Sequence, residues 1–93
     1  MDEEAPTLRR IRDDLAALGT TRTAQRRALQ QVIGWAEHGE LTELGPFSEG
    51  RVRELVQLAI QRLADEETLY AGAGDAENAE AARRGAAALA PYV

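Results

Sequence analysis

Alanine occupies half of the positions between Asp75 and Ala90, and this run is the feature that most constrains how the chain can fold. Alanine has the highest helix propensity of all residues, but its methyl group buries little apolar surface. A helix of this composition is stable only when its backbone packs closely against a neighbouring helix. The run therefore predicts an all-α, closely packed domain.

Length and composition exclude several classes of protein. The 93 residues are enough for one domain with a modest core, and the absence of cysteine excludes disulfides and thiolate metal sites. No apolar run is long enough to span a membrane, and the acidic start, Met1 to Glu4, lacks the basic and apolar segments of a secretory signal. We therefore expect a cytoplasmic protein without a cofactor.

The charged residues bear on both origin and partners. All eleven basic residues are arginine, and together with eighteen alanines they favour a GC-rich genome, such as that of a bacterium or its phage. The net charge of −5 opposes non-specific binding to nucleic acid, because such binding depends on neutralising phosphates. An acidic surface suits solubility and a partner with a basic or mixed surface.

Apolar periodicity and helix-ending residues divide the chain, taken as one domain of residues 1–93, into four helices. We expect them at about residues 6–18, 24–38, 49–71 and 75–90. Gly19 and Gly39 are expected to end the first two, and Ser48 and Asp75 to cap the last two. Short connections predict a small antiparallel four-helix bundle or two stacked helical hairpins.

The third helix has the widest apolar face, so we expect it at the centre of the core. After Leu63 the pattern changes, because Glu66 and Glu67 fall on the stripe that was apolar before. The helix therefore either projects beyond the core or bends near Asp65.

The fourth helix is expected to pack on the third through residues spaced three, four and three apart, namely Ala79, Ala82, Ala86 and Leu89. Glu80 and Arg84 form an i,i+4 pair on its exposed side.

The segment from Leu63 to Pro91 resembles a degenerate tetratricopeptide repeat. The similarity rests on residues at the spacings typical of that repeat, namely Leu63, Tyr70, Gly74, Asp75, Ala79, Ala86 and Pro91. The segment departs from the pattern at Glu66, Glu67 and Arg83. The resemblance implies a helical hairpin with close contact between its helices, and it points to a peptide-binding module.

Trp35 and His38 are the first candidates for a chemical site. The sequence supplies no second histidine, no cysteine and no activated serine to complete a nucleophile. We expect His38 to lie at a helix end that favours its protonated form, and Trp35 to anchor the core. The acidic residues between Asp65 and Glu80 are spread over helical faces, so we predict neither a catalytic nor a metal site.

Six arginines in the first 27 residues raise the question of nucleic-acid binding. The first two helices have the length of a helix-turn-helix, and the candidate contacts are Arg22, Arg26 and Arg27. Nine acidic residues in the first fifty dilute this basic patch, which favours the interpretation of a solvated helix face.

The leading hypothesis is a non-enzymatic helical protein–protein interaction module, acting as an adaptor, inhibitor or assembly factor on a protein partner of unknown identity. Its candidate binding residues are Leu41, Leu44, Phe47 and Tyr92, although the first three could also belong to the core. A homodimer could form through the apolar seam from Leu8 to Leu18. The alternatives are a DNA-binding helix-turn-helix-like regulator that uses the first two helices, and an acidic phage-type inhibitor of a nucleic-acid-binding protein.

Overall fold

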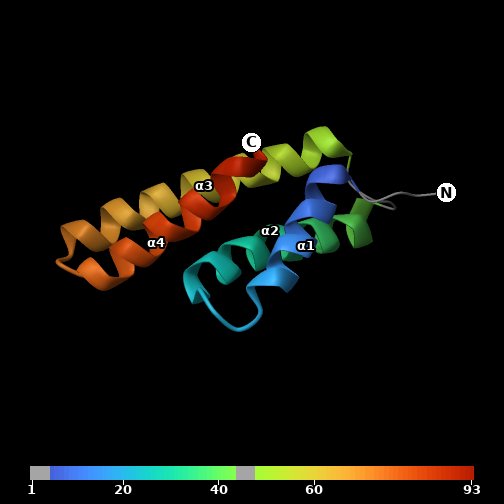
Figure 1. Cartoon of the computed structure of the whole chain (residues 1–93). Helices are drawn as coiled ribbons and strands as arrows, with labels where there is room; N and C mark the ends of the chain where they lie inside the picture. The colour runs from blue at the N-terminus through green and yellow to red at the C-terminus, as the bar shows by residue number, and fades with distance from the viewer. Residues whose placement is uncertain (1–4, 44–47) are drawn as a thin grey trace.

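Four helices of alternating direction make up the described chain (Figure 1). The computed structural model describes residues 5–43 and 48–93, leaving aside the side chains of residues 40–43. The elements are α1 (Pro6–Leu18), α2 (Thr23–Glu43), α3 (Glu49–Gly72), α4 (Ala76–Leu89) and a 3₁₀ turn, η1 (Ala90–Tyr92). These residues contain no strand, and the predicted all-α fold is confirmed.

The helices pair as two hairpins, α1 with α2 and α3 with α4 (Figure 1). α4 packs against both α3 and α2. The far half of the α3–α4 hairpin extends past α1 and α2, so the molecule is elongated, with extents of 49 × 25 × 20 Å. Part of α3 and α4 is therefore covered only by its hairpin partner.

Local sequence signals set several helix ends as predicted. The Ser48 hydroxyl accepts a hydrogen bond from the Arg51 amide at 3.2 Å, and the Asp75 carboxylate accepts one from the Asn78 amide at 3.2 Å. These side chains satisfy amides that the first turns of α3 and α4 leave unpaired. Gly19 follows α1 with a φ of 59°, which is a conformation that glycine adopts without strain.

The end of α2 differs from the prediction. The helix runs through Gly39 and ends at Glu43. One interior glycine costs a helix only about 1 kcal/mol, and no proline or second glycine follows before Glu43. His38 is exposed and lies more than one turn before the end of α2. The prediction that it lies at the helix end was therefore wrong.

The core lies where the two hairpins cross, and α2 contributes more of it than α3 does. The buried residues of α2 are Ala28, Leu29, Val32, Ile33 and Ala36, whereas α3 buries Val52, Val56 and Ala59. α3 contacts each of the other helices, as expected of a central helix, but it is not the most buried one. Its apolar arc is wide, but Leu58 is 53% exposed and Leu69 is 71% exposed.

The alanine-rich helix packs as its composition requires. A methyl group built on Gly85 of α4 would lie 3.3 Å from Leu63 Cδ1 of α3 and 3.4 Å from Ala28 Cβ of α2. Three helices thus meet closely at one glycine. The buried face of α4 is Ala79, Ala82, Gly85 and Leu89, so Gly85 takes the place predicted for Ala86, which is half-buried.

Burial bears on two further expectations. In the apolar seam of α1, Leu8 and Ile11 are fully buried and Leu15 packs against the core, so the seam contributes to the fold, and a dimer through it stays a prediction. α3 continues without a break past Asp65, and none of its residues after Ala59 is fully buried. The helix therefore projects beyond the core.

Candidate functional site

A groove opens between the first half of α2 and the projecting half of the α3–α4 hairpin. It has a volume of ≈ 780 Å³ and is open to solvent. Residues from all three helices line it. They include the charged or aromatic residues Arg22, Arg27, Trp35, Arg62, Glu66, Tyr70, Glu77, Glu80 and Arg84, together with Gln31 and Ala81.

Small residues form the floor of the groove. Ala28, Ala59 and Ala82 are buried there, one from each of the three helices. Their size lets the helix backbones approach closely at this level. Beyond it, the hairpin extends past the start of α2 (Figure 1), and the groove lies in the angle between them.

Two half-buried aromatic side chains line the groove. The guanidinium carbon of Arg62 lies 5.5 Å from the centre of the Trp35 ring, which is a cation–π contact between α3 and α2. Tyr70 lies near the end of α3, close to the hairpin turn. Trp35 was expected to anchor the core. It does pack against the core, but it is only partly buried and it also lines the groove.

Two exposed leucines of α3 lie beside the groove. Leu58, Arg62 and Leu69 are spaced four and seven residues apart, which places them on one stripe of the helix. Because Arg62 lines the groove, the leucines lie along its edge. We call Leu58 and Leu69 the apolar rim. Single exposed leucines are common on protein surfaces, so the apolar rim gains its significance from the groove beside it and not by itself.

Charged side chains of both signs line the groove. Arg22 and Arg27 lie on the α2 side, whereas the hairpin side carries Arg62 and Arg84 together with its glutamates. Within the described part of the chain, the side chains of Arg22, Arg27, Glu66 and Glu77 form no hydrogen bond or ion pair. Arg26, on the same turn of α2, has a buried Nε atom without a hydrogen-bond partner among the described residues.

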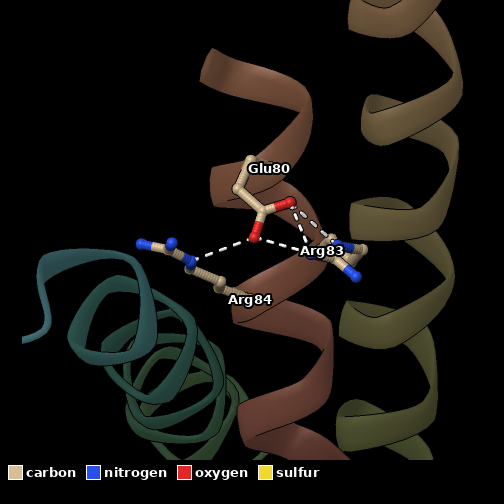
Figure 2. Close-up of polar contacts among 3 residues, drawn as sticks. All are labelled: Glu80, Arg83 and Arg84. Carbon is tan, nitrogen blue, oxygen red and sulfur yellow. Dashed lines mark hydrogen bonds and ion pairs between the residues drawn. The ribbon is translucent and has the colours of Figure 1, made fainter. Parts of the chain in front are cut away.

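The third acid of the hairpin side, Glu80, is neutralised within α4. Figure 2 shows its carboxylate between two arginines, with Arg83 Nη2 at 2.6 Å and Arg84 Nε at 3.1 Å. The hydrogen bond from Arg83 is the main reason that the pKa of Glu80 is lowered. The predicted Glu80–Arg84 pair is therefore present, and Arg83 joins it.

The predicted partner-binding residues fall into two groups. Leu44 and Phe47 lie outside the described residues, as does the side chain of Leu41, so their role stays a prediction. Tyr92 is 6% exposed, and its hydroxyl donates a hydrogen bond to the Asp14 carboxylate. Tyr92 is thus part of the core, and we do not include it in the binding surface proposed below.

The predicted nucleic-acid contacts share one end of α2. The structure brings Arg22 and Arg27 into the groove, and their contact with nucleic acid stays a prediction. Reasoning from sequence did not identify Arg62, Tyr70 or Leu69 as site residues. One of them could have been noticed, because Leu69 is a large apolar residue on the polar side of its helix, and such a residue is expected to be exposed.

Other kinds of site find no support in the described residues. No three histidine, aspartate or glutamate side chains there are grouped so that they could hold a metal ion. No helix in that part of the chain is both long and apolar enough to cross a bilayer.

Comparison with known proteins gave no match to a family model, to a curated protein or to a solved structure. The resemblance to a tetratricopeptide repeat therefore extends only to the helical hairpin formed by α3 and α4.

Proposed function

We propose that the chain is a non-enzymatic helical module that binds a protein segment in the groove between α2 and the α3–α4 hairpin. The observation that carries this proposal is the combination of half-buried Trp35 and Tyr70, an exposed apolar rim and unpaired charges around one open groove. Aromatic and arginine side chains are enriched at protein–protein interfaces and supply much of their binding energy.

The form of the groove favours a macromolecular partner over a substrate. Catalysis requires polar groups that converge in a pocket from which water is excluded. This groove is open, and its unpaired charges lie on opposite walls. His38 is exposed and does not line it.

A nucleic acid fits the groove less well than a protein does. A polyanion bound by Arg22 and Arg27 would also meet Glu66 and Glu77 on the facing wall. Repulsion there would offset the phosphate contacts on which such binding depends. The DNA-binding alternative predicts sequence-selective retardation of DNA at low salt that is lost in the variant Arg26→Ala with Arg27→Ala. We expect no such retardation.

An acidic inhibitor of a nucleic-acid-binding protein is the second candidate function. It is favoured by one observation: the segment from Ala64 to Ala82 has six acidic residues and no basic one. This candidate predicts a complex that weakens steeply as salt is added, because exposed charges are screened.

Two matched variants of α4 test the proposed groove. Ala81 lines the groove and Ala87 is an exposed residue outside its lining. The change Ala81→Gln places a longer, uncharged side chain in the groove, whereas Ala87→Gln makes the same change elsewhere on the helix. We expect Ala81→Gln to reduce the capture of partner protein from native lysate, and Ala87→Gln to leave it unchanged. Equal capture by both variants, with unchanged helicity by circular dichroism, would contradict the proposal.

A further inference from the structure

We infer that two copies of this chain pair through the exposed stripe of α3, with the two helices antiparallel and related by a two-fold axis. The stripe, which we call the α3 seam, consists of Leu58, Arg62, Asp65 and Leu69. The inference goes beyond the proposed function, because only Arg62 of the α3 seam also lines the groove. It assigns the apolar rim to a second copy and leaves the rest of the groove to a foreign segment.

The α3 seam lies on one open face of its helix. Its spacings of four, three and four are those of alternating d and a positions in a coiled coil, which form a single stripe. Leu58 is 53% exposed and Leu69 is 71% exposed, and the two charged residues between them are exposed as well. α3 meets the other helices through different residues, among them buried Ala59. A second helix can therefore reach the α3 seam along its length.

The order of residues along the α3 seam is complementary to its own reverse. The spacings are symmetric about the midpoint between Leu58 and Leu69, so an antiparallel copy places these two leucines opposite each other. The same register places Arg62 opposite Asp65. Because a two-fold axis repeats every contact, the pair would contain two leucine contacts and two contacts between opposite charges. A foreign helix would have to carry the same residues in the same reversed order.

Within one copy, the two charged residues of the α3 seam have no partner of opposite charge. Among the described residues, Arg62 contacts the ring of Trp35 but donates no hydrogen bond and forms no ion pair. Asp65 accepts a hydrogen bond from the neutral Gln61 amide at 3.0 Å and forms no ion pair. Both side chains therefore keep hydrogen-bonding capacity that a second copy can use.

These central charges also select the direction of the pair. In a parallel pair of the same helices, Arg62 would face Arg62 and Asp65 would face Asp65. Repulsion between like charges disfavours that arrangement, whereas the antiparallel one joins opposite charges. Exposed ion pairs contribute little free energy, so their role here is to set the register.

The leucines supply the attraction. Pairing would remove the exposed surfaces of Leu58 and Leu69 from water in both copies. In the next layer outward, half-buried Leu55 would face Gly72, whose lack of a side chain leaves space for it. Only one helix face is used, and both Glu66 beside the α3 seam and the net charge of −5 oppose association. We therefore expect a weak, reversible dimer.

Exchange of the two central charges provides the test. The variants are Arg62→Asp, Asp65→Arg and a double variant with both changes in one chain. We expect wild-type protein to dimerise in sedimentation equilibrium runs between micromolar and millimolar concentration. Each single variant should dimerise at least about tenfold more weakly, because like charges then face each other. An equimolar mixture of the single variants, and the double variant alone, should recover the dimer, because every central pair again joins opposite charges.

Two features of this design separate the α3 seam from a general effect of charge. Asp65→Arg makes the net charge of −5 less negative, so an effect of total charge would strengthen the dimer, whereas the inference predicts a weaker one. Arg9→Asp, on an exposed residue of α1, makes the same change of charge as Arg62→Asp and should leave dimerisation unchanged. Asp65→Arg also leaves the contact between Arg62 and Trp35 in place.

Three outcomes would overturn the inference. The first is a wild-type chain that stays monomeric up to millimolar concentration, and the second is a dimer that neither single variant weakens. The third is failure of both the mixture and the double variant to dimerise while all variants keep wild-type helicity by circular dichroism. None of these results bears on the groove, because Ala81→Gln tests the capture of a foreign protein at a residue outside the α3 seam.

Discussion

Glu49 shows how a single carboxylate joins two helices that are distant in sequence. Ala5 precedes α1 and offers no side-chain cap. Instead, Glu49 of α3 accepts hydrogen bonds from the Thr7 amide, at 2.9 Å, and from the Thr7 hydroxyl. The same carboxylate lies in the first turn of α3 and pairs with Arg53. Glu49 therefore places negative charge at the N-termini of both α1 and α3, where it is favourable.

We predict that Glu49→Ala lowers the free energy of unfolding by about 1–2 kcal/mol, the usual effect of losing a helix cap. Glu54→Ala, on the exposed side of the same helix, should change it by less than about 0.5 kcal/mol. Urea denaturation measures both. Equal effects of the two changes would show that the contact between Glu49 and Thr7 does not stabilise the fold.

The pH dependence of this contact has a defined sign. The hydrogen bond from the Thr7 hydroxyl is the main reason that the pKa of Glu49 is lowered. Ionised Glu49 therefore stabilises the fold above its ordinary pKa, and this contribution is lost as the pH falls through the lowered value. We expect a smaller decrease in stability on acidification in Thr7→Val than in wild type, measured by thermal unfolding across the acidic range. An identical pH profile would contradict this assignment.

Tyr92 links the C-terminal turn to α1 through Asp14, and its ionisation makes stability depend on pH in the alkaline range. Burial, with a contribution from the Asp14 carboxylate, raises the pKa of Tyr92 to about 12. The fold thus favours the neutral phenol, and this stabilisation is present below the ordinary pKa of about 10 and is lost as the pH rises towards the raised value. We predict that Tyr92→Phe costs about 1 kcal/mol at neutral pH and weakens the alkaline loss of stability. An alkaline unfolding profile identical to that of wild type would show that another group is responsible.

At the scale of the element, the packing of α4 is the feature that holds the two hairpins together. Ala82 is buried between helices, and Ala87 on the same helix is exposed. Ala82→Leu should destabilise the protein by about 1–3 kcal/mol, because added methylenes have no space in a close-packed contact. Ala87→Leu should stay within about 0.5 kcal/mol of wild type. If urea denaturation found Ala82→Leu as stable as Ala87→Leu, α4 would not be closely docked.

Sequence reasoning succeeded for features that depend on local chemistry. Ser48 and Asp75 cap α3 and α4 as predicted, because a side chain that reaches its own first turn needs no tertiary context. It failed at Gly39, where a weak helix breaker was outweighed by the helix-compatible residues that follow. It also overestimated the burial of the third helix, on whose wide apolar face Leu58 is exposed, because periodicity assigns a residue to a face but does not show whether a neighbouring helix covers that face.

At the scale of the whole molecule, the groove could not be predicted from the sequence. Its lining comes from α2, α3 and α4, and its shape depends on how far the two hairpins diverge. The sequence shows only that six of the eleven arginines precede Ala28 and that six acidic residues lie between Ala64 and Ala82. The arrangement of the hairpins places residues from both groups along one groove.

The central claim is that the groove between α2 and the α3–α4 hairpin binds a protein segment, and cysteine cross-linking tests it most directly. The chain has no native cysteine, so single cysteines report single positions. Gln31→Cys labels the groove, and Gln57→Cys labels an exposed position of α3 outside the groove lining. With a short photoactivatable maleimide, the account predicts that Gln31→Cys is cross-linked to captured partner protein far more than Gln57→Cys is. Equal yields of the two cross-linked products would contradict it.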